Sequence, residues 1–145
     1  MWMHRGIDLR WAVLVVAVAL GACGGWPGER SPEERRAVWE AGNAFPSGYR
    51  AELLAHLRTY LNDPTGVREA AISDPALRSI GPGDRYVVCV RFNPKKAGGG
   101  YAGVKEHLVI YVGGKLDRYV ETITAGDACR AAAYAPFPEL ERLTR

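Results

Sequence analysis

The chain has 145 residues, of which 48% are hydrophobic, and a formal net charge of +3. This length accommodates one domain with a modest core and excludes two separate domains of ordinary size. So small an excess of positive charge does not predict nucleic-acid binding, which is typical of strongly basic surfaces.

Residues 1–22 are predicted to be a signal peptide. Two arginines precede an unbroken apolar run at 11–20, and this order of charged and apolar residues is typical of secretion signals. The run is shorter than the roughly 20 apolar residues that a membrane-spanning helix needs. The segment 20–23, Leu-Gly-Ala-Cys, resembles a bacterial lipobox, in which cleavage leaves a lipid-carrying cysteine as the first residue. Cys23 is therefore the predicted lipidation site.

The lipid on Cys23 predicts the location of the protein. Two or three acyl chains of the palmitate type hold a protein on a membrane stably, whereas one chain binds only marginally. We therefore expect a lipid-anchored protein of the bacterial cell envelope that faces the periplasm or the exterior. Gly24 stands where lipoproteins retained at the inner membrane often carry aspartate, which favours the outer membrane in a cell with two membranes. The alternative is a secreted protein in which Cys23 carries no lipid.

Cys89 and Cys129 are predicted to form a disulfide. A protein exported from the cytoplasm enters an oxidising compartment, where disulfides form and persist. Closing a loop of about 40 residues contributes about 4 kcal/mol of stability in the chain-entropy model. A redox-active or metal-binding pair is the alternative, but neither cysteine lies in a CxxC motif or beside a histidine.

Residues 23–46 are predicted to be a lipidated tether that contains a short helix. Ser31 is suited to cap this helix, the proline after it suits the first helical position, and Glu34 completes a capping box. The helix is expected to end near Ala41. Trp39 offers a side chain for docking onto the domain, and the sequence leaves open whether the segment docks or stays free.

Residues 47–145 are predicted to form a single α+β domain. Tyr49, Leu53 and Leu57 recur at helical spacing and predict the main helix over 47–61. Alternating apolar and polar residues predict strands over 67–73, which also tolerates helix, 85–92, 104–112 and 116–123. The expected fold is one main helix packed on an antiparallel meander of three or four strands, with one disulfide.

The turn between the last two strands contains two glycines, at 113–114. A two-residue turn would place apolar residues opposite charged ones on both faces, because a one-residue slip turns every side chain to the other face. We therefore predict a three-residue connection with a bulge. This connection pairs Val112 with Leu116. It also pairs Leu108 with Val120.

The most distinctive segment is the glycine-rich loop at 93–103. Its glycines, with Lys95 and Lys96, offer N–H groups and positive charge to an anion. The spacing differs from the GxxxxGK[ST] pattern of phosphate-binding loops, and no helix is predicted after it. The alternative is a folded loop in which the glycines adopt left-handed dihedrals and Tyr101 packs back as a plug.

The strand and loop at 88–103 resemble a pattern in small uncharacterised lipoproteins of the bacterial envelope, in which a cysteine-bearing strand leads through Asn-x-Lys into Gly-Gly-Tyr-x-Gly. The segment 61–67 is similar to a Leu-x-Asp-Pro-x-Ser segment of the same proteins. This chain departs from the pattern at Lys96, where asparagine is usual, and at Gly66, where serine is usual. The resemblance covers roughly residues 50–140 and implies the same architecture, without implying an activity.

No catalytic motif accompanies His56 and His107, the histidines of the expected domain. His56 is predicted on the surface of the main helix, and His107 on the face of its strand opposite Leu108. We therefore expect a protein that is not an enzyme and has no cofactor, metal site or nucleic-acid partner.

The expected function is that of an accessory or protein-interaction module, held on the membrane by Cys23, with an envelope protein as its partner. The alternative is a small-ligand or anion-binding lipoprotein that uses the loop 93–103. The alternating tail at 136–143 is expected to pack on the domain's own sheet. The candidate contact residues are Asn93, Lys95, Lys96, Gly99, Gly100 and Tyr101.

Overall fold

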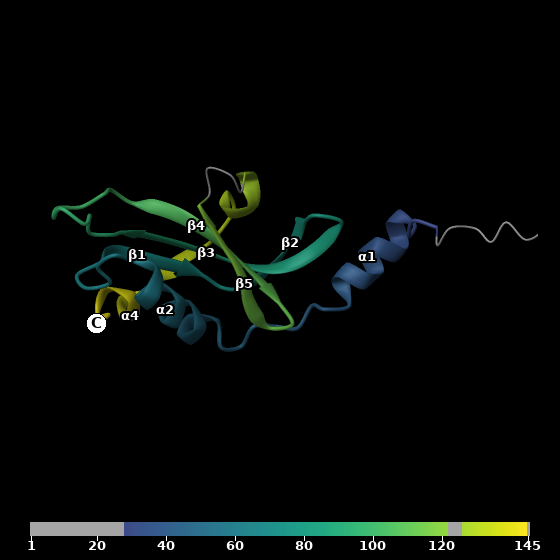
Figure 1. The fold of residues 1–145 in the computed structure, drawn as a ribbon, viewed down its shortest axis with the longest axis horizontal. Helices are drawn as coiled ribbons and strands as arrows, with labels where there is room; N and C mark the ends of the chain where they lie inside the picture. Colours follow the sequence, from purple (N-terminus) through teal and green to yellow (C-terminus); the bar gives the residue numbers. More distant parts are fainter. Residues whose placement is uncertain (1–27, 122–125, 145) are drawn as a thin grey trace, which may run out of the picture. The chain divides into compact units, whose positions relative to one another are not determined.

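A six-stranded antiparallel sheet is the frame of the structure (Figure 1). The computed structural model describes residues 28–121 and 126–144, so the predicted signal peptide 1–22 and lipidation site Cys23 lie outside the described residues. The strands are β1 (Arg68–Ser73), β2 (Ala76–Ile80), β3 (Gly83–Asn93), β4 (Lys105–Val112), β5 (Lys115–Glu121) and β6 (Tyr134–Pro136). The helices are α1 (Pro32–Glu40), α2 (Tyr49–Tyr60) and α4 (Pro138–Glu141), and a 3₁₀ turn, η1, spans Gly126–Cys129. Among the described residues, no helix is long and apolar enough to cross a membrane.

Strand β3 lies at the centre of the sheet. The strand order is β5-β4-β3-β1-β6, and β2 also pairs with β3. Both arrangements fit because β3 has 11 residues: β1 pairs with its C-terminal half, where Ile72 faces Val90, and β2 pairs with its N-terminal half, where Leu77 faces Tyr86. The α+β class, the main helix and the strands β1, β3, β4 and β5 agree with the prediction.

Two strands, β2 and β6, are absent from the predicted meander, so the expectation of three or four strands was too low. Strand β2 lies between Pro75 and Pro82, and no strand was predicted there. It forms a strand because β3 extends beyond β1 and offers it a free edge. Strand β6 has three residues and ends in Pro136, which is tolerated because β6 lies at the edge of the sheet.

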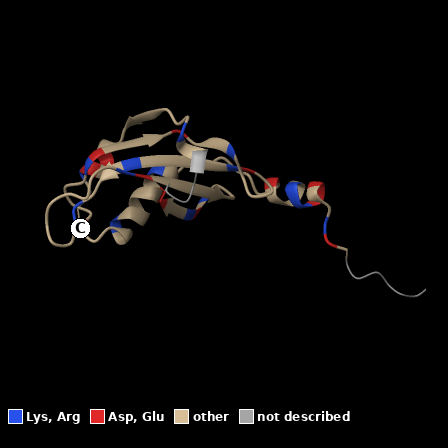
Figure 2. Ribbon diagram, turned by 90° about the horizontal axis from the view of Figure 1, so that it is seen from above, with Lys and Arg blue, Asp and Glu red and all other residues tan. Residues whose placement is uncertain are grey.

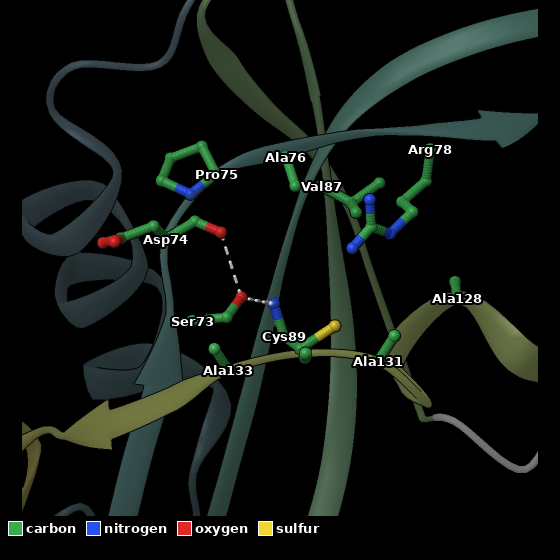
Figure 3. A pocket seen from close by; sticks show the side chains of 11 residues that line it. Ser73, Asp74, Pro75, Ala76, Arg78, Val87, Cys89, Ala128, Ala131 and Ala133 are labelled. Atoms are coloured by element: carbon green, nitrogen blue, oxygen red, sulfur yellow. Dashed lines mark hydrogen bonds between the residues drawn. The ribbon is translucent and has the colours of Figure 1, made fainter.

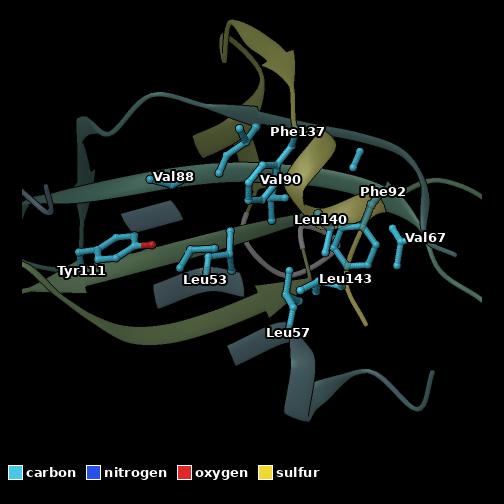
Figure 4. Close-up of a cluster of buried hydrophobic side chains, with 13 residues drawn as sticks. Leu53, Leu57, Val67, Val88, Val90, Phe92, Tyr111, Phe137, Leu140 and Leu143 are labelled. Carbon is cyan, nitrogen blue, oxygen red and sulfur yellow. The ribbon is translucent and has the colours of Figure 1, made fainter. Parts of the chain in front are cut away.

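Helix α2 covers one face of the sheet and supplies the centre of the core (Figure 4). Leu53 and Leu57 are fully buried, as their helical spacing predicts. After Tyr60 the backbone turns extended at Leu61, shortly before Pro64. The buried side chains of this face are Leu53, Leu57, Val67, Ala70, Ile72, Val88, Val90, Phe92, Val109, Tyr111, Phe137, Leu140 and Leu143.

The opposite face of the sheet carries a second, smaller apolar cluster. It contains Val87, Cys89, Leu108, Ile110 and Cys129. The predicted disulfide between Cys89 and Cys129 is present, with 5.7 Å between the Cα atoms, and it holds η1 against this face. Val87 and Cys89 thus face this cluster, whereas Val88 and Val90 face the core on the α2 side.

The register between β4 and β5 differs in part from the prediction. Leu108 pairs with Val120 as predicted, but the turn is a two-residue turn in which both glycines at 113–114 have positive φ, and Tyr111 rather than Val112 pairs with Leu116. The register shifts between Ile110 and Tyr111, inside the strand pair and not in the turn. The predicted pairing of Val112 was wrong. A bulge inside the strand pair changes which side chains face each other by one residue, and a longer turn is not needed for that.

The C-terminal tail packs on the domain's own sheet, as expected. The N–H of Phe137 donates to the carbonyl of Ala70 at 2.9 Å, and the N–H of Ala70 donates to the carboxylate of Glu141 at 2.9 Å. Phe137 and Leu140 are fully buried. The tail therefore completes the core on the α2 face.

Helix α1 has the capping box predicted for it. The Glu34 N–H donates to Ser31 Oγ at 3.1 Å, and the Ser31 N–H donates to the Glu34 carboxylate at 2.8 Å. The helix ends at Glu40 with Ala41 as its cap, as predicted. Acidic and basic residues follow one another along it (Figure 2). None of its residues is fully buried. The compact unit of the chain begins at Ser31, so this part of the predicted tether belongs to it.

Helix α1 docks on the N-terminal end of β3 through its last residues. The guanidinium of Arg85, which is buried, lies 4.2 Å from the centre of the Trp39 ring. The carboxylate of Glu40 accepts the N–H of Asp84 at 3.1 Å. A Cβ atom at Gly83 would lie 2.7 Å from that carboxylate, so a glycine permits the close approach.

Replacing this glycine should undock α1. In a chain that begins at Gly28, Trp39 is the only tryptophan, so its fluorescence reports the docking. We expect Gly83→Val to shift the emission of Trp39 to longer wavelength and to weaken docking by about 1–3 kcal/mol, as overpacked contacts do. The control is Gly48→Val, because no atom lies within 4 Å of a Cβ there. Identical spectra for both variants would contradict the proposed docking contact.

Candidate functional site

The loop at 93–103 is a folded extension of the β3–β4 pair, and we call it the Gly-rich hairpin. Lys95 and Tyr101 face each other in an antiparallel bridge. The Ala102 N–H donates to the carbonyl of Pro94 at 3.1 Å, and the Lys96 N–H donates to the carbonyl of Gly100 at 3.0 Å. The hairpin lies at the opposite end of the sheet from α1 (Figure 1).

The glycines at the tip of the Gly-rich hairpin adopt the backbone conformation that its turn requires. Gly99 and Gly100 have φ values of +87° and +73°, and a Cβ at either position would meet no atom within 4 Å. The Gly99 N–H donates to the carbonyl of Lys96 at 3.1 Å. Positive φ is the conformation in which glycine is favoured over other residues, so the glycines are explained by the turn.

Tyr101 anchors the Gly-rich hairpin to the body of the domain. Its hydroxyl donates to the carbonyl of Gly66 at 2.9 Å, and the guanidinium of Arg68 lies 4.2 Å from the centre of its ring. A Cβ at Gly66 would lie 2.9 Å from the end of the Lys95 side chain. Tyr101 therefore packs back on the domain, as the folded-loop alternative predicted.

Asn93 joins the base of the Gly-rich hairpin to β1. Its amide nitrogen donates to the carboxylate of Glu69 at 3.1 Å, and its amide oxygen accepts the N–H of Gly103 at 2.9 Å. Glu69 has a positive φ of 56° at a bulge in β1. Such a conformation is uncommon for residues other than glycine. The hydrogen bond between Asn93 and Glu69 therefore links the base of the hairpin to this bulge.

The structure thus separates the six candidate contact residues into three pairs. Asn93 and Tyr101 hold the hairpin in place, and Gly99 and Gly100 form its turn. The N–H groups of Lys96, Gly99 and Ala102 donate within the hairpin, and the remaining two candidates, both lysines, supply positive charge. Lys95 lies 3.9 Å from the carboxylate of Asp63, and Lys96 is exposed.

The two lysines also border a hollow of about 460 Å³, which we call the lysine hollow. Its other wall comes from the end of α2 and from β4. Among the lining residues that were not predicted to form a site, five carry an aromatic ring or a charged group: Tyr60, Phe92, Lys105, His107 and Glu121. They lie on four different elements or element ends, so no local motif in the sequence marks them.

His107 lies beneath the lysine hollow in a stack of rings. Only 3% of its surface is exposed, and its ring stacks on Phe92 and Tyr119 at centroid distances of 5.2 and 4.8 Å. Its Nε2 atom lies 3.7 Å from a carboxylate oxygen of Glu121, and Lys105 lies 3.3 Å from the same oxygen. Among the described residues, its Nδ1 atom has no hydrogen-bond partner.

Burial shifts the pKa values of two side chains in this cluster. It lowers the pKa of His107, and the nearby carboxylate of Glu121 opposes this effect only in part. It also raises the pKa of the Tyr119 hydroxyl, which stays protonated at neutral pH. The ring of His56 stacks on Tyr60 at 5.5 Å and contacts Tyr119 at 5.0 Å, so both histidines belong to one cluster of rings.

A second hollow, of about 220 Å³, lies beside the disulfide (Figure 3). The buried hydroxyl of Ser73 lies within it and makes two hydrogen bonds. It accepts the N–H of Cys89 at 2.9 Å and donates to the carbonyl of Asp74 at 3.1 Å. Both hydrogen bonds are to backbone groups, so Ser73 stabilises the backbone beside this hollow. Neither partner is a general base of the kind that activates a serine as a nucleophile.

Comparisons with known proteins add no relative. No family model matches the chain, and neither a curated protein nor a solved structure matches it. Across the residues that the structure describes, no three histidine, cysteine or acidic side chains are grouped to hold a metal ion.

His107 should make the stability of the domain depend on pH. Because the pKa of the folded state lies below that of the unfolded chain, the unfolded chain binds the proton more readily. The free energy of unfolding is therefore expected to be fully retained above about pH 6.5 and to fall as the pH decreases below it. Urea unfolding between about pH 7.5 and pH 5 measures this slope.

The control for this prediction is His107→Gln, which removes the buried imidazole and keeps a polar side chain. Its free energy of unfolding should vary less with pH across the same interval. Equal slopes for both proteins would show that His107 does not cause the dependence.

Proposed function

We propose that the protein is a lipid-anchored module of the bacterial cell envelope, not an enzyme, that binds a protein partner through the Gly-rich hairpin. The lipid is carried by Cys23, the first residue after the signal peptide 1–22. The resemblance of 88–103 to small envelope lipoproteins supports this proposal. The rigid hairpin, rather than a catalytic group, is the feature that contacts other molecules.

The observation that carries the proposal is the position of the two ends of β3. Helix α1, which follows the anchor segment in the chain, docks at the N-terminal end, and the Gly-rich hairpin extends from the C-terminal end. A strand of this length spans about 35 Å. The hairpin therefore lies at the end of the domain that is remote from the docked helix α1.

Few residues separate the proposed lipidation site from the compact unit that includes α1. Only 24–30 separate Cys23 from Ser31, and a fully extended chain covers at most about 3.6 Å per residue. The start of the compact unit is then held within about 30 Å of the lipidated residue. The lipid anchor therefore keeps the domain near the membrane surface.

The charge of the Gly-rich hairpin indicates the kind of partner. Lys96 is exposed on it, Lys95 lies beside the carboxylate of Asp63, and Arg68 lies over the ring of Tyr101 at its base. A surface of this sign attracts an acidic patch and excludes basic ones. The internal hydrogen bonds of the hairpin reduce the conformational entropy that binding would otherwise remove. An acidic surface on an envelope protein is the partner we propose.

A second candidate function is the binding of a small ligand or anion. It is supported by the lysine hollow, where Lys95 and Lys96 meet Lys105 across a concave surface. A hollow of this kind accommodates a small molecule without any contribution from a protein partner.

Changing Cys23 to Ser should release the protein from the membrane. Without the thiol no lipid is attached, and the described domain, which lies after Gly28, keeps all its packing contacts. We expect the Cys23→Ser variant in the soluble fraction of disrupted cells, with the unchanged chain in the membrane fraction. A Cys23→Ser variant that remains in the membrane fraction would rule out the lipid anchor.

Photo-crosslinking in the native membrane tests the proposed contact surface. A photoreactive residue in place of Ala97, at the exposed tip of the Gly-rich hairpin, should form one defined adduct with another envelope protein. The matched control is the same residue in place of Ala51, which is exposed on α2. Adding Lys96→Glu should reduce the adduct at least about fivefold if the partner surface is acidic.

An adduct from position 51 alone, or equal adducts from both positions, would refute the role of the hairpin. An adduct from position 97 that Lys96→Glu increases would instead show that the partner surface is basic.

A further inference from the structure

The lysine hollow has the size and lining of a site for a small organic molecule. Its volume of about 460 Å³ lies within the usual range for ligand pockets, about 300–1,000 Å³. Three rings line it: Tyr60, with 53% of its surface exposed, and the buried Phe92 and His107. Aromatic rings in a lining favour a flat apolar group, because such rings pair in offset-stacked or edge-to-face arrangements.

The charges around the hollow favour an anion. Lys95, Lys96 and Lys105 line it, and Glu121 is the carboxylate among the lining residues. The ion pairs of Lys95 and Lys105 are long, at 3.9 and 3.3 Å, and partly exposed. Such surface pairs contribute little stability, so these lysines are able to turn toward a bound ligand.

The carboxylate of Glu121 also limits the charge of the ligand. It lies in the lining with Lys105 and His107, and a second negative charge on the ligand would be repelled by it. Within the described residues Lys96 forms no ion pair, which leaves one cation uncompensated at the rim. This balance of charges favours one carboxylate over a phosphate that carries two charges.

We propose that the lysine hollow binds a small aromatic monocarboxylate, whose ring lies against Tyr60 and whose carboxylate is held by Lys96 and Lys105. The inference rests on the second candidate function and assigns the chemical class of its ligand. It does not depend on a protein partner at the tip of the hairpin.

Binding of 2-naphthoate to the full chain in lipid nanodiscs tests this inference. Two comparison compounds each lack one half of the ligand: 2-naphthylmethanol has the ring without the charge, and acetate has the charge without the ring. We expect 2-naphthoate to bind at least about tenfold more tightly than either, measured by equilibrium dialysis. Binding should also shift the imidazole NMR signals of His107, because a ring placed over the hollow changes the local field.

Three variants locate the site. The double variant Lys96→Ala/Lys105→Ala should weaken 2-naphthoate at least about tenfold, whereas Lys115→Ala/Arg118→Ala, which removes the same charge from exposed positions on β5, should not. Tyr60→Ala should weaken 2-naphthoate by about threefold to tenfold and leave acetate unchanged. Tyr60 is exposed, so this variant is expected to fold.

The possible results separate the ligand class from the general function. If acetate binds as tightly as 2-naphthoate, the aromatic class is overturned while anion binding stands. If 2-naphthylmethanol binds equally, recognition of the carboxylate is overturned. If none of the compounds binds, both the inference and the second candidate function are overturned. Equal loss in the two lysine double variants would place the binding outside the hollow.

Discussion

The burial of β3 on both faces is the constraint on which the rest of the structure depends. Val88 and Val90 face the core beneath α2, and Val87 and Cys89 face the opposite cluster. A strand that is apolar on both faces needs a cover on each, since buried apolar area is what stabilises it. The helices α2 and α4 cover one face. The turn η1, held by the disulfide, covers the other.

Because β3 is long, different parts of the domain lie at its two ends. Its N-terminal end pairs with β2 and receives α1, where Gly83 leaves room for the last turn of the helix. Its C-terminal end continues into the Gly-rich hairpin, which Asn93 joins to the bulge in β1. One strand thus joins the part of the domain where α1 docks to the Gly-rich hairpin.

The sequence predicted the hairpin more fully than it predicted the lysine hollow. Periodicity identified β3 and β4, and the glycines between them indicated a turn with left-handed residues. Lys105 and Tyr60 were not predicted as site residues, because a lysine at the start of a strand and a tyrosine at the end of a helix are common in sequences. His107 was placed on the correct face of its strand, but the stack with Phe92 and Tyr119 depends on how three elements meet.

The sequence by itself determined the local structure of this protein: the capping box at Ser31, the main helix, four strands, and the two cysteines that pair. These features follow from contacts between residues close in the chain, or, for the cysteines, from the oxidising compartment that the predicted signal peptide implies. Only the tertiary structure decided the pairing of β2 and β6, the bulge that resets β5, and the lysine hollow. Each of these depends on which edge or surface a distant element leaves free, and a local pattern carries no information about that.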